Sequence, residues 1–135
     1  FFLTYGDGVC DIDLAKLLEF HKSTSVTATV TAVRPPARFG SLELEEDKVT
    51  RFAEKSQATE GWINGGFFVL ENEIFQYLDD GSDCVFEGKP LEKLASQGRL
   101  SAYRHEGFWQ CMDTLRDLKL LRALWDEGSP PWKIW

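Results

Sequence analysis

The stretch Phe1-Phe2-Leu3-Thr4-Tyr5-Gly6-Asp7-Gly8 decides how the rest of this chain is interpreted. Its five apolar or β-favouring residues, 1–5, predict a buried strand, and the aspartate between two glycines predicts a sharp turn at the end of that strand. In an open α/β sheet, ligands collect beyond the carboxyl ends of the strands. Asp7 is therefore a candidate ligand for a hard cation such as Mg²⁺, and the Asp-Gly turn of a β-hairpin is the alternative interpretation.

The residues that follow this turn favour an α/β fold. Residues 13–22 keep a helical apolar spacing and start at Asp13, a good N-cap, so no hairpin partner is expected directly after the turn. Residues 26–33 alternate with a period of two and are rich in β-branched residues, which predicts a second strand. Strand, helix and strand in this order form a βαβ unit, whose two strands are expected to run parallel with a right-handed crossover.

The middle of the chain predicts a hairpin and a long strand. Residues 41–45 and 48–52 flank Glu46-Asp47 as a hairpin, with a bulge or strand end between Val49 and Phe52. The strand 62–70 contains Gly65-Gly66, which marks either a packing bulge or a place where a ligand approaches the backbone. Further elements are helices at 72–79 and 90–97, a strand at 99–104, and a last helix with a buried stripe of Leu118, Leu121, Leu124 and Trp125.

Asp113 directly precedes this last predicted helix. Thr114-Leu115-Arg116-Asp117 fits a capping box, with a hydroxyl at the N-cap and a carboxylate three residues later. Because Thr114 fills the N-cap position better, Asp113 is left without that structural role and becomes a second candidate ligand. Mg²⁺ takes one or two carboxylates together with substrate phosphate oxygens, so Asp7 and Asp113 are suited to share one site.

Composition excludes several classes of partner. The 135 residues make one domain, and 15 basic against 22 acidic residues argue against nucleic acid or an anionic membrane as a partner. The three cysteines lie far apart without a CxxC pair, which predicts a reducing, cytoplasmic location and no zinc site. No apolar run is long enough to span a membrane, and no signal peptide is expected. The chain starts inside a predicted strand without an initiator Met, so further sequence is expected upstream.

Several motifs occur together in the order and spacing of a known family: Tyr5-Gly6-Asp7-Gly8, Glu54-Lys55, Trp62-Ile63-Asn64-Gly65-Gly66-Phe67-Phe68-Val69, Gly107-Phe108-Trp109-Gln110 and Met112-Asp113-Thr114. With them the chain resembles the sugar-1-phosphate nucleotidyltransferases over essentially its whole length. Within that family it looks closest to the members that transfer CMP from CTP to glucose 1-phosphate. The alternatives are another nucleotide or hexose, as in dTDP-, UDP- or ADP-glucose synthesis, or a non-catalytic sugar-phosphate-binding or assembly domain.

The resemblance implies an α/β fold with a Rossmann-like nucleotidyltransferase sheet, mixed but mostly parallel, and flanking helices. It implies that residues 1–135 are the C-terminal portion of one such domain. It also implies three catalytic residues, Asp7, Asp113 and Lys55, of which the two aspartates bind Mg²⁺. It also implies a set of substrate-binding residues, with Lys55 holding the sugar phosphate: Gly40, Glu54, Lys55, Asn64, Gly65 and Trp109. From the pattern alone, a solvated strand end is the more common interpretation of Glu54-Lys55.

One part of the family pattern is absent from these residues. The glycine-rich loop that grips the base and triphosphate, with its Arg and following Lys, belongs to the N-terminal half of the family's domain. The chain alone is therefore expected to be inactive. Because its sheet would be cut at the first strand, it is also expected to expose apolar surface and to form a homo-oligomer.

Overall fold

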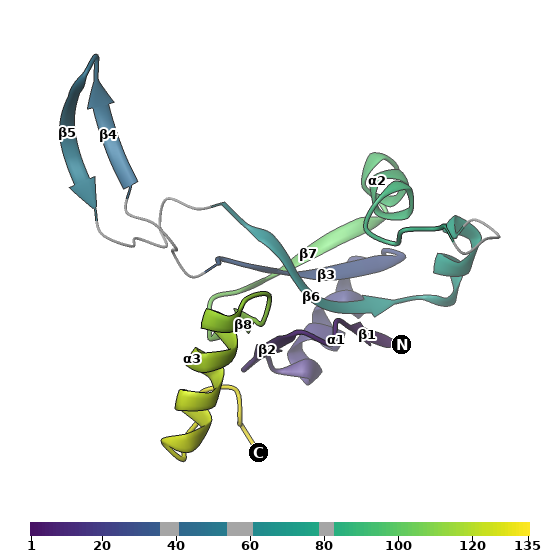
Figure 1. Cartoon of the computed structure of the whole chain (residues 1–135). Helices are drawn as coiled ribbons and strands as arrows, with labels where there is room; N and C mark the ends of the chain where they lie inside the picture. Colours follow the sequence, from purple (N-terminus) through teal and green to yellow (C-terminus); the bar gives the residue numbers. More distant parts are fainter. Residues whose placement is uncertain (36–40, 54–60, 79–82) are drawn as a thin grey trace.

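A four-stranded sheet forms the centre of the computed structural model, which describes residues 1–35, 41–53, 61–78 and 83–135 (Figure 1). The strand order is β1-β6-β3-β7, with bounds β1 Phe2–Thr4, β6 Ile63–Leu70, β3 Ala28–Val33 and β7 Leu100–His105. β6 is antiparallel to both β1 and β3, whereas β3 and β7 are parallel. Three of the four strands therefore run in one direction, and the sheet is mixed, as predicted.

The predicted βαβ unit consists of β1, α1 (Leu14–Thr24) and β3, with Asp13 as the N-cap of the helix. β1 and β3 run in the same direction, but they are not neighbours, because β6 lies between them. The reason is the pairing of Phe68, which lies opposite Leu3 on one side and Val30 on the other and is completely buried. β6, which comes later in the chain, thus inserts between β1 and β3.

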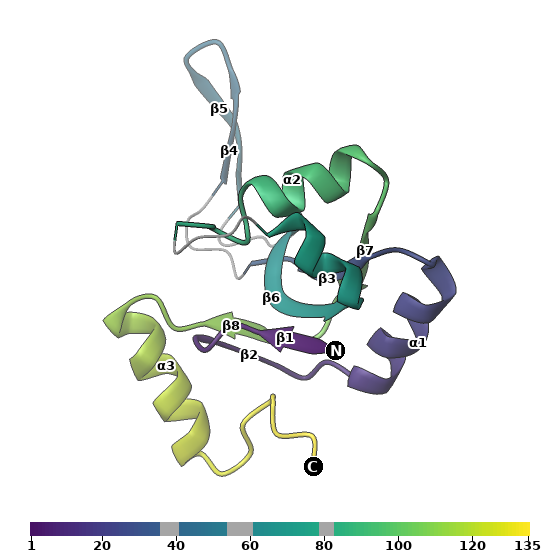
Figure 2. The same ribbon diagram turned by 90° about the vertical axis from the view of Figure 1, so that its right-hand side faces the viewer.

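Helices cover both faces of the sheet (Figure 2). On one face, α2 (Lys89–Ser96) and the 3₁₀ helix η2 (Asn72–Tyr77) pack over a core cluster that includes Phe68, Leu70 and Leu94. On the other face, α1 contributes the buried Leu17 to a second cluster that includes Val69 of β6. Successive residues of a strand point to opposite faces, so the buried run at the end of β6 supplies both clusters. η2 replaces the longer helix predicted at 72–79.

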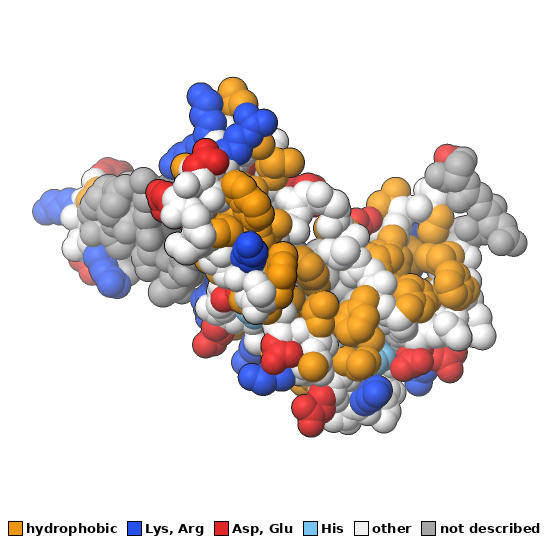
Figure 3. Space-filling model, turned by 90° about the horizontal axis from the view of Figure 1, so that it is seen from below, with side chains coloured by type: hydrophobic (Ala, Val, Ile, Leu, Met, Phe, Trp, Pro, Cys, Tyr) orange, Lys and Arg blue, Asp and Glu red, His pale blue; other side chains and the backbone are white. Residues whose placement is uncertain are grey.

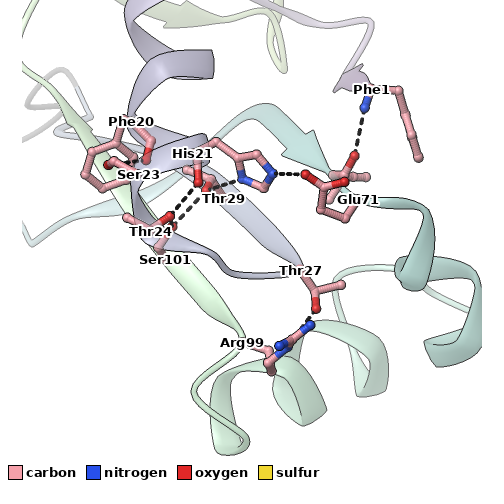
Figure 4. A network of polar contacts seen from close by, with 11 residues as sticks. Phe1, Phe20, His21, Ser23, Thr24, Thr27, Thr29, Glu71, Arg99 and Ser101 are labelled. Carbon is pink, nitrogen blue, oxygen red and sulfur yellow. Dashed lines mark hydrogen bonds and ion pairs between the residues drawn. The ribbon is translucent and has the colours of Figure 1, made fainter.

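A polar network fixes α1 to the sheet (Figure 4). The buried His21 ring contacts Thr29 Oγ1 through Nδ1 at 2.8 Å and Glu71 Oε1 through Nε2 at 3.1 Å. Thr29 Oγ1 in turn lies 2.7 Å from Ser101 Oγ, so three elements share one chain of hydrogen bonds. A buried polar group must be satisfied in this way, and the network fixes how the helix sits on β3 and β7.

A separate two-stranded ribbon lies beside the main sheet. β2 (Gly8–Cys10) pairs antiparallel with β8 (Trp109–Cys111), and α3 (Leu115–Asp126) follows β8. The expectation that no strand follows the Asp-Gly turn was wrong, because β2 begins at Gly8. β2 does not pair with β1, however, so the turn is not that of a β-hairpin. A strand of three residues is too short for its alternation to be recognised in sequence.

The predicted hairpin is confirmed. β4 (Ser41–Glu45) pairs with β5 (Lys48–Ala53), and the hairpin that they form projects away from the main sheet in both views (Figures 1 and 2). Glu46 turns the chain with a left-handed φ of 53°. Glu43 lies opposite Arg51 and Leu44 opposite Val49, so Thr50 is the extra residue. This is the bulge predicted between Val49 and Phe52.

The prediction of a buried stripe on α3 was wrong. Leu118, Leu121 and Leu124 are only half-buried, and Trp125 is 55% exposed. The physical reason is position, because α3 extends from the ribbon beside β8 and does not lie over a face of the main sheet (Figure 2). After α3, Trp132 stacks on Phe108 with ring centroids 5.7 Å apart, which holds the C-terminal tail against the ribbon.

Large apolar side chains remain exposed at several places. Phe1 and Phe2 are 50% and 47% exposed at the β1 end of the sheet, Phe75 is 62% exposed and Trp135 84%. Figure 3 shows apolar side chains gathered across the lower face of the molecule. Within the described residues, no helix combines the length and the apolar character that crossing a membrane needs. An exposed apolar surface of this kind favours association with another protein surface.

We propose that the 135-residue chain self-associates through this apolar surface. Light scattering should give a mass above that of the monomer, and Phe2→Ser with Phe75→Ser should shift it toward the monomer because the exposed apolar area falls. Lys133→Ser, an exposed polar position, is the matched control. A monodisperse monomer for the unaltered chain would contradict the proposal.

Candidate functional site

A pocket of about 390 Å³ lies where the carboxyl end of β1 meets β6 and the ribbon. This is the edge at which an open α/β sheet collects ligands. Its walls come from the segments after β1 and β3, the start of β6, and β8 with the residues after it. The lining residues are Tyr5, Asp7, Gly8, Pro35, Ile63, Asn64, Gly65, Trp109, Cys111 and Asp113.

The ribbon brings Asp7 and Asp113 to this one pocket. The backbone N–H of Met112 donates to the Asp7 carbonyl at 2.8 Å, so the two aspartates lie on adjacent backbone segments. Both side chains are exposed and line the pocket. The Cys111 thiol donates to Asp113 Oδ2 at 3.3 Å. The structure thus puts together two residues that are far apart in sequence, and their role as metal ligands stays a prediction.

The two carboxylates suit Mg²⁺ better than they suit a metal ion that takes all of its ligands from protein side chains. Carboxylate oxygens are hard ligands, and Mg²⁺ is usually held by one or two of them with waters and substrate phosphates. Within the described residues, no group of three or more His, Cys, Asp or Glu side chains could hold a metal ion. A cation bound here would therefore need ligands from water or from a phosphorylated substrate.

A capping box positions Asp113, as predicted. Thr114 is the N-cap of α3, its Oγ1 accepting from the Asp117 N–H at 3.2 Å, and Asp117 Oδ2 accepts from the Thr114 N–H at 3.0 Å. The Asp117 carboxylate is 8% exposed and its Oδ1 also accepts from Gln110 Nε2 at 3.3 Å. Asp117 therefore links the start of α3 to β8, and these two elements flank the segment that carries Asp113.

Gly65 and Gly66 form a bulge that also lines the pocket. The register of β6 against β3 shifts between Val30 and Ala32, where β6 has extra residues. A Cβ at Gly65 would lie 2.8 Å from Val33 Cγ1, and Gly66 has a left-handed φ of 77°. The indole N–H of Trp109 donates to the Gly65 carbonyl at 2.8 Å. The packing-bulge interpretation is confirmed, and ligand contact at Gly65 and Trp109 stays a prediction.

Tyr5 is a lining residue that the sequence analysis missed. Its ring packs against Gly66, since a Cβ added to Gly66 would lie 2.8 Å from Tyr5 Cδ2. Asn64 Nδ2 donates to the Tyr5 hydroxyl at 3.0 Å. Burial, then a hydrogen bond to Glu87, raise the pKa of Tyr5 to about 12, although the Asn64 hydrogen bond acts to lower it. The sequence could have indicated Tyr5 as a lining residue, because it stands at the carboxyl end of the predicted strand, directly before Gly-Asp-Gly.

Contacts of Asp11 hold the segment between β7 and β8 against the residues that follow β2. His105 Nε2 lies 2.8 Å from Asp11 Oδ1, and the Asp11 N–H donates to the Phe108 carbonyl at 3.2 Å. Gly107 passes so close that an added Cβ would overlap Asp11 Oδ1 and lie 2.8 Å from His105 Cε1. His105 is therefore a structural residue held by polar contacts, and this turn requires glycine.

A second, apolar pocket of about 440 Å³ lies between β2, the start of α1 and the C-terminal tail. It is lined by Cys10, Ile12, Leu14 and the aromatic residues Phe67, Trp132 and Trp135, among others. Burial raises the pKa of the Cys10 thiol to about 11, so this cysteine stays protonated and unreactive at neutral pH. The smaller pocket remains the candidate site because it contains the two carboxylates.

Three of the predicted site residues, Gly40, Glu54 and Lys55, lie outside the described residues. The structure therefore does not test whether they face the pocket. Their roles in binding the sugar phosphate stay predictions.

Comparisons with known proteins agree with this fold. Residues 1–124 match the nucleotidyl transferase family. The chain is 47% identical over all its 135 residues to the glucose-1-phosphate cytidylyltransferase of Salmonella typhi, of which it covers 52%. It is 31% identical over 118 residues to the mannose-1-phosphate guanylyltransferase of Mycobacterium tuberculosis, with 83% of this chain and 33% of that protein covered.

A solved structure shows the same fold. A Bacillus anthracis protein, assigned as a glucose-1-phosphate thymidylyltransferase, superposes with a TM-score of 0.62 at 17% identity, covering 91% of this chain and 53% of that one. The mixed sheet with helices on both faces and a pocket at its strand ends defines an α/β fold. The chain belongs to the nucleotidyl transferase family. It spans about half the length of the curated relatives it matches.

The capping box predicts different effects for two neighbouring aspartates on stability. Asp117→Ala should lower the free energy of unfolding by about 1–3 kcal/mol, because the Thr114 N–H and Gln110 lose a buried acceptor. Asp113→Ala, at an exposed position ahead of the N-cap, should change it by less than about 0.5 kcal/mol. Urea unfolding of the two variants measures both values. An equal loss in the two variants would show that Asp113 carries part of the helix start.

Proposed function

We propose that this chain is part of an enzyme that transfers CMP from CTP to glucose 1-phosphate, giving CDP-glucose and pyrophosphate. The observation that carries the proposal is the meeting of Asp7 and Asp113 at one pocket, formed by a single antiparallel ribbon. The choice of CTP and glucose 1-phosphate is supported by the relative from Salmonella typhi, which is 47% identical. The guanylyltransferase relative, which uses a different base by its name, is 31% identical.

In the proposed reaction, a phosphate oxygen of glucose 1-phosphate attacks the α-phosphorus of CTP. The bond from that phosphorus to the bridging oxygen of the β-phosphate breaks, and pyrophosphate leaves. Asp7 and Asp113 would hold Mg²⁺ against the phosphate oxygens, and the bound ion would offset negative charge as it moves to the leaving group. Lys55 would hold the nucleophilic phosphate in line, with Glu54 and Gly40 on the sugar.

The activity belongs to the whole protein. The glycine-rich loop with which family members grip the triphosphate is not in this sequence, so the 135-residue chain alone is not expected to turn over. The three cysteines all lie within the described residues and form no disulfide, which is compatible with the proposed cytoplasmic location.

Asp113→Asn should remove most of the turnover of the full-length gene product while leaving its stability nearly unchanged. The amide keeps the size of the side chain but loses the charge that holds the cation, so kcat should fall by about a hundredfold or more. Pyrophosphate release from CTP and glucose 1-phosphate, with a Mg²⁺ titration, measures this. The variant should also need more Mg²⁺ for half-maximal rate, and Asp126→Asn, an exposed aspartate at the end of α3, is the matched control.

Two outcomes of this assay would decide against the proposal. Turnover by the unaltered protein only with another nucleotide or another hexose phosphate would shift the assignment within the family. Absence of turnover with every nucleotide, in a protein that still binds glucose 1-phosphate, would favour a non-catalytic sugar-phosphate-binding domain.

Lys55→Ala should raise the KM for glucose 1-phosphate and leave the KM for CTP nearly unchanged. Loss of a charged hydrogen bond to the sugar phosphate is worth about ten- to a hundredfold in binding. Steady-state kinetics with each substrate varied in turn separates the two constants, and Lys48→Ala, in the projecting hairpin, is the control. Unchanged kinetics for glucose 1-phosphate would make Lys55 a solvated strand end.

A further inference from the structure

The tail that follows α3, residues 128–135, turns back and attaches to the ribbon of β2 and β8. Gly128, just after the end of the helix, has a left-handed φ of 85°, which reverses the chain there. Figure 2 shows the tail turning back from the end of α3. Trp132 then stacks on Phe108, with ring centroids 5.7 Å apart and an angle of 29° between the ring planes. This stack closes a loop of chain that contains β8, Asp113 and α3.

The backbone and the ring of Phe108 are held by different contacts. Its carbonyl accepts from the Asp11 N–H at 3.2 Å and lies 3.3 Å from His105 Nε2. Trp132 contacts the ring, and it also lines the apolar pocket beside β2. Backbone contacts leave the side-chain torsions free, so the stack determines where the ring lies. Phe108 is therefore fixed in both position and orientation directly before β8 begins.

The next residue, Trp109, faces the candidate pocket on the other side of the ribbon. Successive residues of an extended strand point to opposite faces. Trp109 lines the candidate pocket and Trp132, the partner of Phe108, lines the apolar one, and no described residue lines both. The Trp109 indole N–H donates to the Gly65 carbonyl at 2.8 Å, which attaches the ribbon to β6. A displacement of Phe108 would therefore move the neighbouring Trp109 backbone and lengthen this hydrogen bond.

We propose that Trp132 is a positioning residue for the candidate site. Its stack on Phe108 keeps the Trp109 indole on the Gly65 carbonyl, and so holds the ribbon and its two aspartates at the pocket. Trp132 does not line this pocket, so it acts on the site only through the ribbon. The effect on catalysis rests on the proposed function, whereas the effect on the Trp109 hydrogen bond does not.

The first experiment measures the Trp109 hydrogen bond in the full-length gene product without any substrate. In protein labelled with ¹⁵N at tryptophan, NMR gives the rate at which each indole N–H exchanges with solvent. Trp132→Ala should speed the exchange of the Trp109 N–H about tenfold, because its bond to Gly65 opens more often. Trp132→Phe should restore the rate toward the unaltered value, since a phenyl ring still stacks. Trp135→Ala, which removes an 84% exposed indole of the same tail, is the matched control and should change nothing.

The second experiment measures turnover of the same variants with CTP, Mg²⁺ and glucose 1-phosphate. Trp132→Ala should lower kcat about tenfold, because a small displacement of the metal-binding groups from the substrate slows the reaction. The Mg²⁺ concentration for half-maximal rate should stay nearly unchanged, since the stack lies at the opposite end of the ribbon from the hydrogen bond between Met112 and Asp7. This result differs from that expected for Asp113→Asn, which needs more Mg²⁺. Trp132→Phe should recover most of kcat.

A double variant tests whether Trp132 acts through Phe108. Phe108→Leu removes the stacking partner and keeps an apolar side chain at the start of the ribbon. The double variant Phe108→Leu with Trp132→Ala should match Phe108→Leu alone in both the exchange rate and kcat, since two residues of one contact are not additive. The thermal midpoint of every variant is measured alongside, so that a change in overall stability is recognised.

The outcomes separate this inference from the function on which its kinetic part rests. Unchanged exchange of the Trp109 N–H in Trp132→Ala overturns the inference, and so does faster exchange with an unchanged kcat in an active protein. Faster exchange at every indole with a lower thermal midpoint, or an equal effect of Trp135→Ala, overturns it in favour of a role in stability alone. If the unaltered protein turns over glucose 1-phosphate with no nucleotide, the proposed function fails, and the exchange rates alone decide whether Trp132 holds the pocket wall.

Discussion

The pocket depends on the close approach of the β6 backbone to β3 at Gly65. An added Cβ would lie 2.8 Å from Val33 Cγ1 and 3.0 Å from the Thr31 carbonyl, so the strand can pass there only without a side chain. Because the backbone bulges at this point, the Gly65 carbonyl reaches the indole of Trp109 in the ribbon, and the Gly66 amide reaches the side chain of Asn64. One pair of glycines thus joins the main sheet to the ribbon that carries both aspartates.

Local periodicity predicted most of the elements of the fold. The helix after Asp13, the alternating strand that ends at Val33 and the projecting hairpin were all readable, and the three-residue spacing of Val49 and Phe52 located the bulge at Thr50. The order of the strands could not be read in this way. It depends on the pairing of Phe68 with two strands from earlier in the chain, which is a non-local contact that no short window of sequence contains.

The candidate site was predictable to a different degree at each residue. Helix-capping chemistry assigned the N-cap to Thr114 rather than to Asp113, and the predicted capping box is present. Family resemblance indicated Asn64 and Trp109, whereas the paired glycines inside a predicted strand had already marked Gly65. The spacing of leucines on α3 correctly marked its apolar side, but spacing cannot show whether another element covers that side.

The ribbon of β2 and β8 has a consequence for how the two aspartates could move. Their backbones are joined by the hydrogen bond from Met112 to Asp7, and the paired strands that continue from this point are short and antiparallel. A rotation of the ribbon relative to the main sheet would therefore carry Asp7 and Asp113 together as one rigid unit. Opening or closing of the pocket would change the distance from this pair to Asn64 while leaving the spacing of the two carboxylates constant. If Asp7 and Asp113 bind a cation as we propose, the ribbon would fix the spacing of these two ligands while the distance from them to Asn64 could change.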